Sequence, residues 1–308
     1  VLPNNAPLTD TPLASGTVTG LTATITGLNP ATDYDLYVKV NCGTTIGESF
    51  WSLRVDFTTG CAPITTPFFQ NFDTTPVGSS ANPSTPVCWS FLAPPYVDWD
   101  SGYGYTYQWT SYSSPHSFYI TNNYDTSGDF ILVGPETVDL GNGTMQLRFY
   151  AQGDWDGGNQ LIVGTMSDPA QANTFTPIPN GTITLTGSFG EYEVEIPAGT
   201  NDYFAFKLDA SSTYSNVYID NVHYEPLPSC LGVQFGSLTA TGVTDVQATL
   251  SWVSSSTNFD VEWGPINFTQ GAGTLVSNVA NNYVLNGLTQ STEYSYYVRS
   301  NCGVDGTS

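Results

Sequence analysis

Two acidic turns carry the residue types that bind a hard cation. Residues 98–102 read Asp-Trp-Asp-Ser-Gly, and residues 154–159 read Asp-Trp-Asp-Gly-Gly-Asn. An Asp-x-Asp-x-Gly step places two carboxylates on one side of a tight turn, as calcium loops do, but neither turn has the distal glutamate of an EF-hand. Ordinary Asx turns are the favoured alternative. The candidate ligands in the two turns are Asp98, Asp100, Asp154, Asp156 and Asn159.

A run of alternating aromatic residues forms the second candidate site. Its rings belong to Tyr103, Tyr105, Tyr107 and Trp109. In an extended segment all four would lie on one face. If that face were exposed, the rings could stack on sugars, with Asp98, Asp100 and Gln108 nearby as hydrogen-bond partners. If it were buried, the rings would fill the core of a β-sandwich, which is the interpretation that we favour.

Residues for catalysis are harder to find. His116 and His223 are the only histidines, and neither stands in a metalloprotease helix motif or a nucleophile elbow. Acidic residues are abundant, but nothing singles out a pair for glycoside hydrolysis. We therefore expect a protein that is not an enzyme.

The charge of the chain limits its partners. Twenty-seven acidic residues stand against five basic ones, for a net charge of -22. This charge repels phosphate backbones and anionic membrane surfaces, so we expect neither nucleic-acid binding nor membrane insertion, and no apolar run has membrane length. The 30 glycines and 20 prolines suit short strands joined by turns, and no segment indicates an amphipathic helix. The prediction is an all-β protein.

An internal repeat places the same type of segment near both ends of the chain. Residues 28–43 return at residues 288–303 with eight of sixteen positions unchanged, which is the signature of a tandem array. The pattern Leu28-x-Pro30-x-Thr32-x-Tyr34-x-Leu36-x-Val38 resembles the E–F corner and F strand of a fibronectin type III domain, where the tyrosine forms a tyrosine corner. Residues 246–252 and 259–263 resemble strands B and C of that fold, and residues 50–59 resemble strand G.

The middle of the chain resembles a different module. Residues 129–133, 145–150, 160–163, 192–196, 203–208 and 217–222 alternate like strands. The segment opens with Cys61, a Phe-Asp step at 72–73 and Cys88-Trp89, and it closes with Ile-Asp-Asn-Val at 219–222. This is similar to the MAM-type jelly roll, although Cys88 adjoins the tryptophan directly and asparagine replaces the second aspartate. We predict two partial fibronectin type III sandwiches, at 1–60 and 229–308, flanking a MAM-like jelly roll at 61–228.

These resemblances guide the assignment of the five cysteines. Cys42 ends the expected F strand and Cys61 follows the G strand, which places them roughly 30 Å apart, beyond the reach of a disulfide of about 7 Å between Cα atoms. Cys302, the counterpart of Cys42, should lie beside Cys230. We therefore pair Cys230 with Cys302, and Cys61 with Cys88, as in the first disulfide of the MAM family; Cys42 remains unpaired in this chain. Buried free thiols are the alternative. Structural disulfides indicate an oxidising, extracellular location.

A calcium site follows from the jelly-roll resemblance. The first and last strands of this fold lie side by side, and relatives hold a structural Ca²⁺ there with acidic side chains from both. The resemblance implies Asn71, Asp73 and Asp220 as ligands, and oxygen donors favour Ca²⁺ over transition metals. Ordinary edge-strand acids are the alternative.

The module order resembles that of secreted bacterial surface adhesins, including those of gliding bacteria. It implies an extracellular stalk, fibre or filament that contacts copies of itself, neighbouring repeats or surface glycans. We expect the chain to be part of a longer tandem array. The competing interpretation is a carbohydrate-binding accessory region of a large secreted enzyme.

Overall fold

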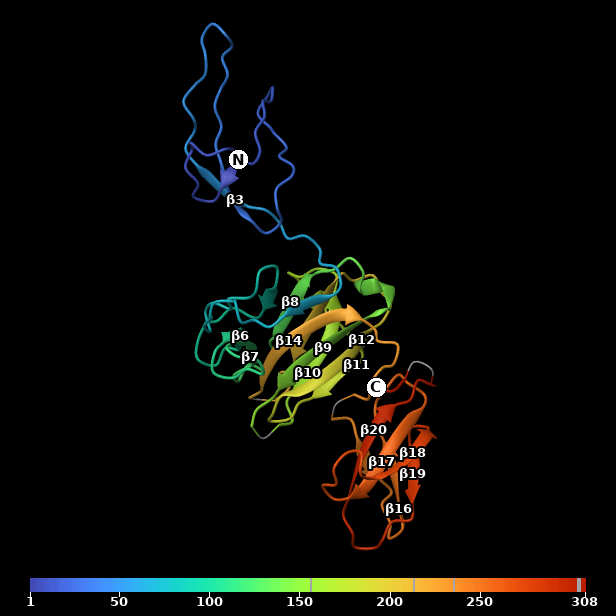
Figure 1. Ribbon diagram of the computed structural model, residues 1–308. Coiled ribbons are helices and arrows are strands. Elements are labelled where there is room, and N and C mark those ends of the chain that lie inside the picture. The colour runs from blue at the N-terminus through green and yellow to red at the C-terminus, as the bar shows by residue number, and fades with distance from the viewer. Residues whose placement is uncertain (156, 213, 235, 304–305) are drawn as a thin grey trace. The chain divides into compact units, whose positions relative to one another are not determined.

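The computed structural model describes residues 1–308 except 156, 213, 235 and 304–305. The all-β prediction is confirmed: the described residues form strands and two short 3-10 helices, η1 (Leu140–Asn142) and η2 (Ala172–Thr174). The chain divides into two compact units, Val1–Ile64 and Thr65–Ser308 (Figure 1).

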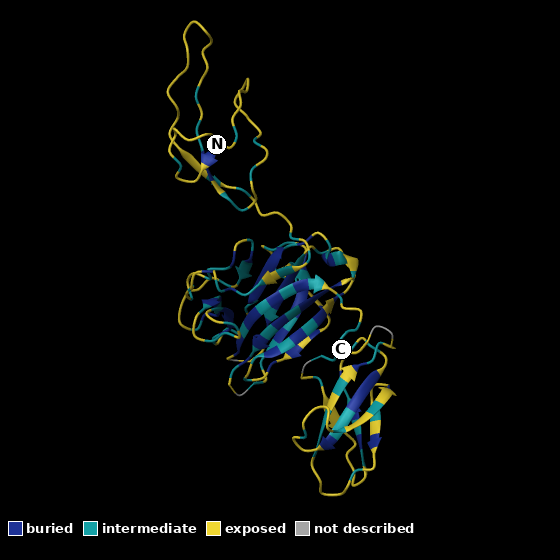
Figure 2. Ribbon diagram, viewed as in Figure 1, coloured by how far each residue is buried: buried dark blue, intermediate teal, exposed yellow. Residues whose placement is uncertain are grey.

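The unit Val1–Ile64 is a three-stranded sheet in the order β1-β2-β3. Its strands are β1 (Leu2–Pro3), β2 (Asp33–Leu36) and β3 (Val55–Thr58). β2 and β3 lie inside the predicted F and G strands but are shorter. Leu2 and Tyr34 are buried, whereas Val38 and Leu53, which lie outside the strands, are exposed. Exposed residues make up most of this unit (Figure 2).

Residues 65–228 contain two sheets. The five-stranded sheet has the order β11-β10-β13-β8-β5, and the six-stranded sheet has the order β12-β9-β14-β7-β6 with β4 also paired to β14. The strands are β4 (Phe68–Gln70), β5 (Ser90–Leu92), β6 (Tyr103–Tyr107), β7 (Ser117–Thr121), β8 (Ile131–Glu136), β9 (Met145–Gln152), β10 (Gln160–Met166), β11 (Thr176–Thr184), β12 (Gly190–Ile196), β13 (Tyr203–Leu208) and β14 (Asn216–Pro226).

The core of this module is rich in aromatic rings. Phe149 packs edge-on against Phe206 with ring centroids 4.9 Å apart, and Trp89 packs against Phe204 at 5.5 Å. Burying one phenylalanine side chain completely stabilises the fold by on the order of 2 kcal/mol, because its apolar surface is removed from water. The first and last strands lie side by side as predicted, since Gln70 of β4 is the register partner of Val222 in β14.

The C-terminal sandwich contains two three-stranded sheets, ordered β15-β16-β19 and β18-β17-β20. The strands are β15 (Thr239–Thr241), β16 (Gln247–Ser251), β17 (Phe259–Pro265), β18 (Thr274–Val279), β19 (Tyr283–Asn286) and β20 (Tyr294–Ser300). β16 and β17 fall where the B and C strands were predicted. Trp252, directly after β16, and Phe259 of β17 meet in the core at 5.0 Å between ring centroids.

The two copies of the repeated segment share one local structure. The Asn29 N–H donates to Tyr34 Oη at 2.8 Å, and the Thr289 N–H donates to Tyr294 Oη at 3.0 Å. Gly27 and Gly287 both have positive φ angles, 80° and 83°. Because this six-residue corner forms the same bond in both copies, its structure is a property of its local sequence.

Candidate functional site

The three tyrosines of β6 stand on the outer face of the six-stranded sheet. They alternate with Gly104 and Thr106, which are buried and face the core. A Cβ at Gly104 would lie 2.7 Å from the Phe91 ring, so that inward position has no room for a side chain. The interpretation that the tyrosines fill the core is therefore wrong. Which residues of β6 face outward is decided by the Phe91 ring, which packs against the inner face of β6 and belongs to β5.

Tyrosines of two neighbouring strands extend this aromatic surface. Tyr119 of β7 is the register partner of both Tyr105 and Tyr218 of β14. The rings of Tyr119 and Tyr218 stack at 4.9 Å, and Tyr107 lies 5.2 Å from Tyr119. We call this set the tyrosine tract: Tyr103, Tyr105, Tyr107, Tyr119 and Tyr218.

Each ring of the tyrosine tract packs against another; Tyr119 is buried, and the other four tyrosines are half-buried. Burial raises the pKa of Tyr218 to about 12 and also raises the pKa of Tyr119. Both phenols are therefore protonated at neutral pH and can donate hydrogen bonds. Tyr119 Oη already donates to Asn216 Oδ1 at 2.6 Å.

Trp109 lies beyond the end of β6 and is 77% exposed, so it does not share the strand face of the tyrosines. It borders an open hollow of about 520 Å³ next to the tyrosine tract. Gln152 of β9, the register partner of Tyr218, also lines it. We call it the Trp109 hollow, and its lining residues are Gln108, Trp109, Thr110, Ser111, Ser114, Pro115, Gln152 and Phe189.

The loop that carries Trp109 is fixed by the fully buried carboxylate of Asp220 on β14. Asp220 Oδ2 accepts the N–H groups of Tyr112 at 2.8 Å and Ser113 at 2.9 Å. The ring of Tyr112 also stacks on Tyr150 of β9. These bonds tie the loop across the outer face of the sheet.

Burial raises the pKa of Asp220 to about 6, although the N–H donors of Ser113, Asn221 and Tyr112 oppose this change. The negative charge of Asp73 raises the pKa further. Both carboxylates also accept backbone N–H groups of one segment, from Tyr112 and Ser113 to Asp220 and from His116 to Asp73.

The oxygen atoms around this acid pair are the kind that Ca²⁺ prefers. Asp73 Oδ1 accepts the His116 N–H at 3.1 Å, and Asp73 Oδ2 accepts Asn71 Nδ2 at 2.6 Å. Among the described residues, no group of three or more His, Cys, Asp or Glu side chains is arranged so that it could hold a metal ion. The chemistry of the donors fits a hard cation, while in this structure they hold loops in place.

The first acidic turn forms an Asx turn, whereas the asparagine side chain closes the second. Asp98 Oδ1 accepts the Asp100 N–H at 3.1 Å, and Asn159 Oδ1 accepts the Asp154 N–H at 2.7 Å. Asp154 Oδ1 in turn accepts Asn216 Nδ2 at 2.5 Å. The remaining candidate of these turns, Asp156, lies outside the described residues.

An ionic cluster that the sequence analysis did not find lies on the same sheet face. Arg148 of β9 pairs with Glu225 at 2.8 Å and with Glu191 at 3.0 Å, and hydrogen bonds to Glu225 and Glu191 raise the pKa of the arginine. His223 packs on Phe69 at 4.4 Å between ring centroids. The sequence feature that could have indicated this cluster is the alternation of charged and apolar residues in β9 and β12.

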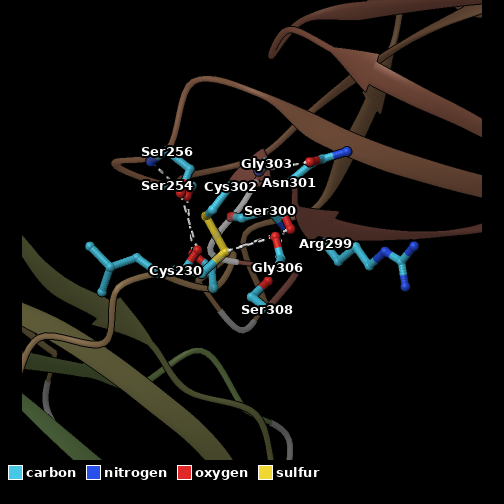
Figure 3. The surroundings of a disulfide bond; sticks show 12 residues. Cys230, Ser254, Ser256, Arg299, Ser300, Asn301, Cys302, Gly303, Gly306 and Ser308 are labelled. Atoms are coloured by element: carbon cyan, nitrogen blue, oxygen red, sulfur yellow. Dashed lines mark hydrogen bonds between the residues drawn. A yellow bond between two sulfur atoms is a disulfide. The ribbon is translucent and has the colours of Figure 1, made fainter.

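The C-terminal sandwich holds a disulfide and a second buried aspartate. Cys230 and Cys302 are joined, the pair expected from the sequence, with Cα atoms 5.6 Å apart (Figure 3). Cys61 and Cys88 are also disulfide-bonded, and their pairing with each other remains the prediction made above. Cys42 is a free, exposed thiol.

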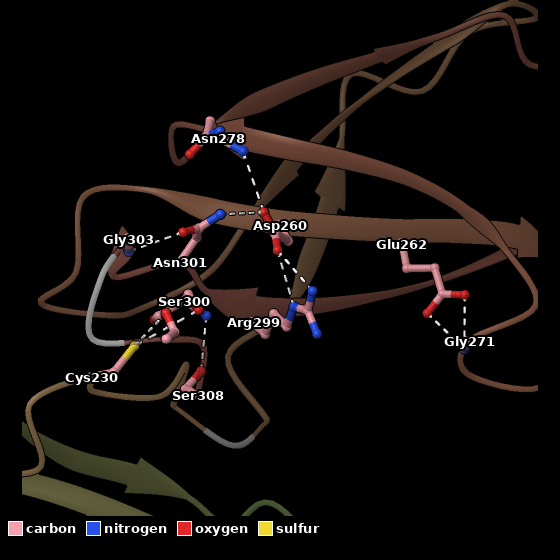
Figure 4. A network of polar contacts seen from close by, with 11 residues as sticks. Cys230, Asp260, Glu262, Gly271, Asn278, Arg299, Ser300, Asn301, Gly303 and Ser308 are labelled. Atoms are coloured by element: carbon pink, nitrogen blue, oxygen red, sulfur yellow. Dashed lines mark hydrogen bonds and ion pairs between the residues drawn. The ribbon is translucent and has the colours of Figure 1, made fainter.

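Asp260 of β17 sits at the centre of a polar network (Figure 4). Arg299 donates to Asp260 Oδ2 from Nε at 3.1 Å and from Nη2 at 3.0 Å, and Asn301 Nδ2 donates to Oδ1 at 2.8 Å. Burial alone would raise the pKa of Asp260, but the bonds from Asn301 and Arg299 outweigh it and lower the pKa. This carboxylate is ionised and structural.

Comparison with known proteins matches residues 233–308 to the fibronectin type III domain family. No curated protein sequence matches the chain at a significant level. No helix among the described residues is long and apolar enough to cross a membrane.

Several solved structures share parts of the architecture. The K1 cleaved adhesin domain of Lys-gingipain from Porphyromonas gingivalis W83 is 18% identical, covers 53% of this chain and 99% of that one, and has a TM-score of 0.40. The CBM22-1 xylan-binding domain of Paenibacillus barcinonensis Xyn10C is 8% identical, with coverages of 54% and 97% and a TM-score of 0.36. The Endo-D glycoside hydrolase domain of Streptococcus pneumoniae R6 is 12% identical, with coverages of 79% and 42% and a TM-score of 0.35. At these scores the likenesses by themselves decide neither ligand nor activity.

Proposed function

We propose that this chain is part of an extracellular adhesive protein whose jelly-roll module binds carbohydrate on the outer face of its six-stranded sheet. The observation that carries the proposal is the tyrosine tract leading into the Trp109 hollow. Tyrosine combines an apolar ring with a hydroxyl group, so a surface of tyrosines offers contact area and hydrogen bonds together. The protein acts by binding and not by catalysis.

The disulfide and the net charge of the chain support an extracellular location. The Cys230–Cys302 disulfide requires an oxidising compartment. The net charge of -22 keeps the protein soluble and reduces nonspecific contact with nucleic acids and anionic membranes.

Affinity electrophoresis of the full chain in gels containing neutral polysaccharides tests this function. We expect retardation by at least one of them, and Tyr105→Ala should weaken it because the tract loses a central ring. Tyr283→Ala, a half-buried tyrosine of the C-terminal sandwich, is the matched control. Unchanged mobility of the wild-type protein across xylan, glucomannan, β-glucan, galactan and mannan gels would remove carbohydrate binding from the proposal.

A mechanical role as a segment of a stalk, fibre or filament is the second candidate function. It is supported by the repeated tyrosine corners at Tyr34 and Tyr294, which mark one module type on either side of the jelly roll. Contacts with copies of itself or with neighbouring repeats would then build the fibre. Electron micrographs of the native material should show long periodic fibres, whereas discrete particles would contradict this role.

We also propose that Asn71, Asp73 and Asp220 bind a structural Ca²⁺. The support is the mutual repulsion of two carboxylates that a cation would relieve. Calcium should raise the calorimetric transition of the jelly roll relative to EDTA, and Asp73→Asn should abolish the difference. The matched control is Asp98→Asn, which changes a carboxylate of an Asx turn elsewhere on the module. Equal transitions in calcium and EDTA would exclude a structural ion.

A further inference from the structure

We propose that the Trp109 hollow is the subsite that contacts the sugar, and that it takes an uncharged sugar ring with Trp109 as the stacking surface. This inference rests on the proposed carbohydrate-binding function and names its ligand class and its main contact. None of the eight lining side chains is ionisable, although the whole chain has 27 acidic residues.

The lining supplies the two kinds of contact that a neutral sugar needs. Gln108 and Gln152 have amides that both donate and accept hydrogen bonds, and Thr110, Ser111 and Ser114 add hydroxyl groups. Sugar hydroxyl groups also donate and accept, so such a lining pairs with them without a charge. An apolar ring face completes the contact with the C–H side of a pyranose.

Trp109 is better placed for stacking than the tyrosine tract. Within the tract, ring faces are covered by neighbouring rings, as in the stacked pair Tyr119 and Tyr218. Trp109 is 77% exposed and borders the hollow directly. The tyrosine tract then extends the surface along the sheet, over about 10 Å from β6 to β14 at about 4.8 Å per strand.

The shape of the hollow depends on Asp220, which we assign as a positioning residue. Its buried carboxylate accepts two consecutive backbone N–H groups, from Tyr112 and Ser113, between the lining residues Ser111 and Ser114. An asparagine side chain has one oxygen acceptor, and an NH₂ donor replaces the second oxygen. It therefore cannot accept the N–H groups of Tyr112, Ser113 and Asn221 together, as the carboxylate does. Asp220→Asn should therefore loosen the loop and weaken binding without removing any group that touches the sugar.

Binding of the full chain to xylan, glucomannan and β-glucan, compared with alginate and polygalacturonate, tests the proposal by affinity electrophoresis and calorimetry. The measurements are made in 0.5 M NaCl, where the screening length is about 4 Å, so that the overall negative charge does not decide the result. We expect at least one neutral polysaccharide to bind and both anionic ones to bind at least tenfold more weakly.

Trp109→Ala should weaken binding at least tenfold, because a buried tryptophan anchor commonly dominates an interface. Trp155→Ala is the matched control: it removes a more exposed tryptophan, 91% accessible, that does not line the hollow. It should change affinity less than twofold. Circular dichroism confirms that each variant is folded.

Asp220→Asn should weaken the same binding, because the loop loses one of its acceptors. Asp220→Glu keeps both carboxylate oxygens and should retain more of the binding than Asp220→Asn. Equal losses in the two variants would show that the carboxylate does not position the loop.

The outcomes separate the two proposals. If no polysaccharide binds, the proposed function and this inference both fail. If a polysaccharide binds, but Trp109→Ala binds as tightly as wild type or alginate binds as well as the neutral polymers, carbohydrate binding stands and the Trp109 hollow is not its subsite.

Discussion

The jelly roll and the C-terminal sandwich each bury one aspartate on a central strand, and the two carboxylates have opposite pKa changes. Asp220 accepts backbone N–H groups, has no cationic partner in the contacts described, and has its pKa raised to about 6 mainly by burial. Asp260 is bonded by Arg299 and Asn301, and its pKa is lowered.

The difference teaches that burial alone does not determine the state of an acid; its partners do. A guanidinium and an amide make Asp260 a permanently charged cross-strand link. Backbone N–H groups make Asp220 an anchor for a loop, and they leave its charge only partly compensated. One aspartate serves stability, and the other serves the shape of a candidate site.

Removing the disulfide should have the largest effect on the stability of the C-terminal sandwich, and with it on the support for Asp260. Cys302 follows Asn301, so Cys302→Ser frees the strand end that presents Asn301 to Asp260. Opening a cross-link between residues 72 positions apart should cost about 4 kcal/mol. Scanning calorimetry should show a lower transition for the C-terminal sandwich only. Cys42→Ser, at the exposed free thiol, should change nothing.

Removing the cation should have the next largest effect. Arg299→Met leaves Asp260 buried without its charge partner and should destabilise the sandwich by about 1–2 kcal/mol, a moderate cost because the arginine is 45% exposed. Lys39→Met is the matched control, since Lys39 is its counterpart in the first copy and pairs with Glu48 at the surface. A change below 0.5 kcal/mol is expected there. Equal effects of the two substitutions would show that Asp260 needs no cation.

The pH dependence of stability should distinguish the two aspartates most finely. The pKa of Asp220 is higher in the folded than in the unfolded state, so the folded state retains a proton between about pH 4 and 6, and jelly-roll stability should fall as pH rises through this window. The folded-state pKa of Asp260 is lowered, so its contribution is present above the unfolded pKa and lost as pH falls through the folded value.

Calorimetry from about pH 2 to 7 should show that Asp220→Asn removes the pH-dependent loss in the jelly roll. Asp260→Asn should instead remove an acid-induced loss in the C-terminal sandwich. If both variants changed stability in the same direction with pH, the assignment of opposite pKa changes would be wrong.

Local sequence predicted the elements that are local. The alternating strands such as β13 were predicted from pattern alone, and the corners at Tyr34 and Tyr294 from a short motif that resembles a fibronectin type III domain, because their periodicity and bonds are contained in short segments. The adjacency of β4 and β14 came from the jelly-roll resemblance and not from a pattern in either strand.

The candidate site depends on distant contacts, which the sequence pattern does not contain. Asp220 and the N–H of Tyr112 are 108 residues apart, so nothing near Asp220 indicates a loop anchor. The direction of the β6 tyrosines is decided by Phe91, which belongs to a strand of the other sheet. The ionic cluster of Arg148 with Glu225 likewise needs two strands 77 residues apart.

The crowding beneath β6 has a consequence for how tolerant this surface is to change. A Cβ at Gly102 would meet the Phe130 ring at 2.3 Å, and one at Gly104 would meet Phe91 at 2.7 Å. A slip of β6 by one position would force phenol rings into that space. The buried phenylalanine rings therefore allow β6 only one register. Each outward tyrosine can be substituted without changing which face of β6 points to the core.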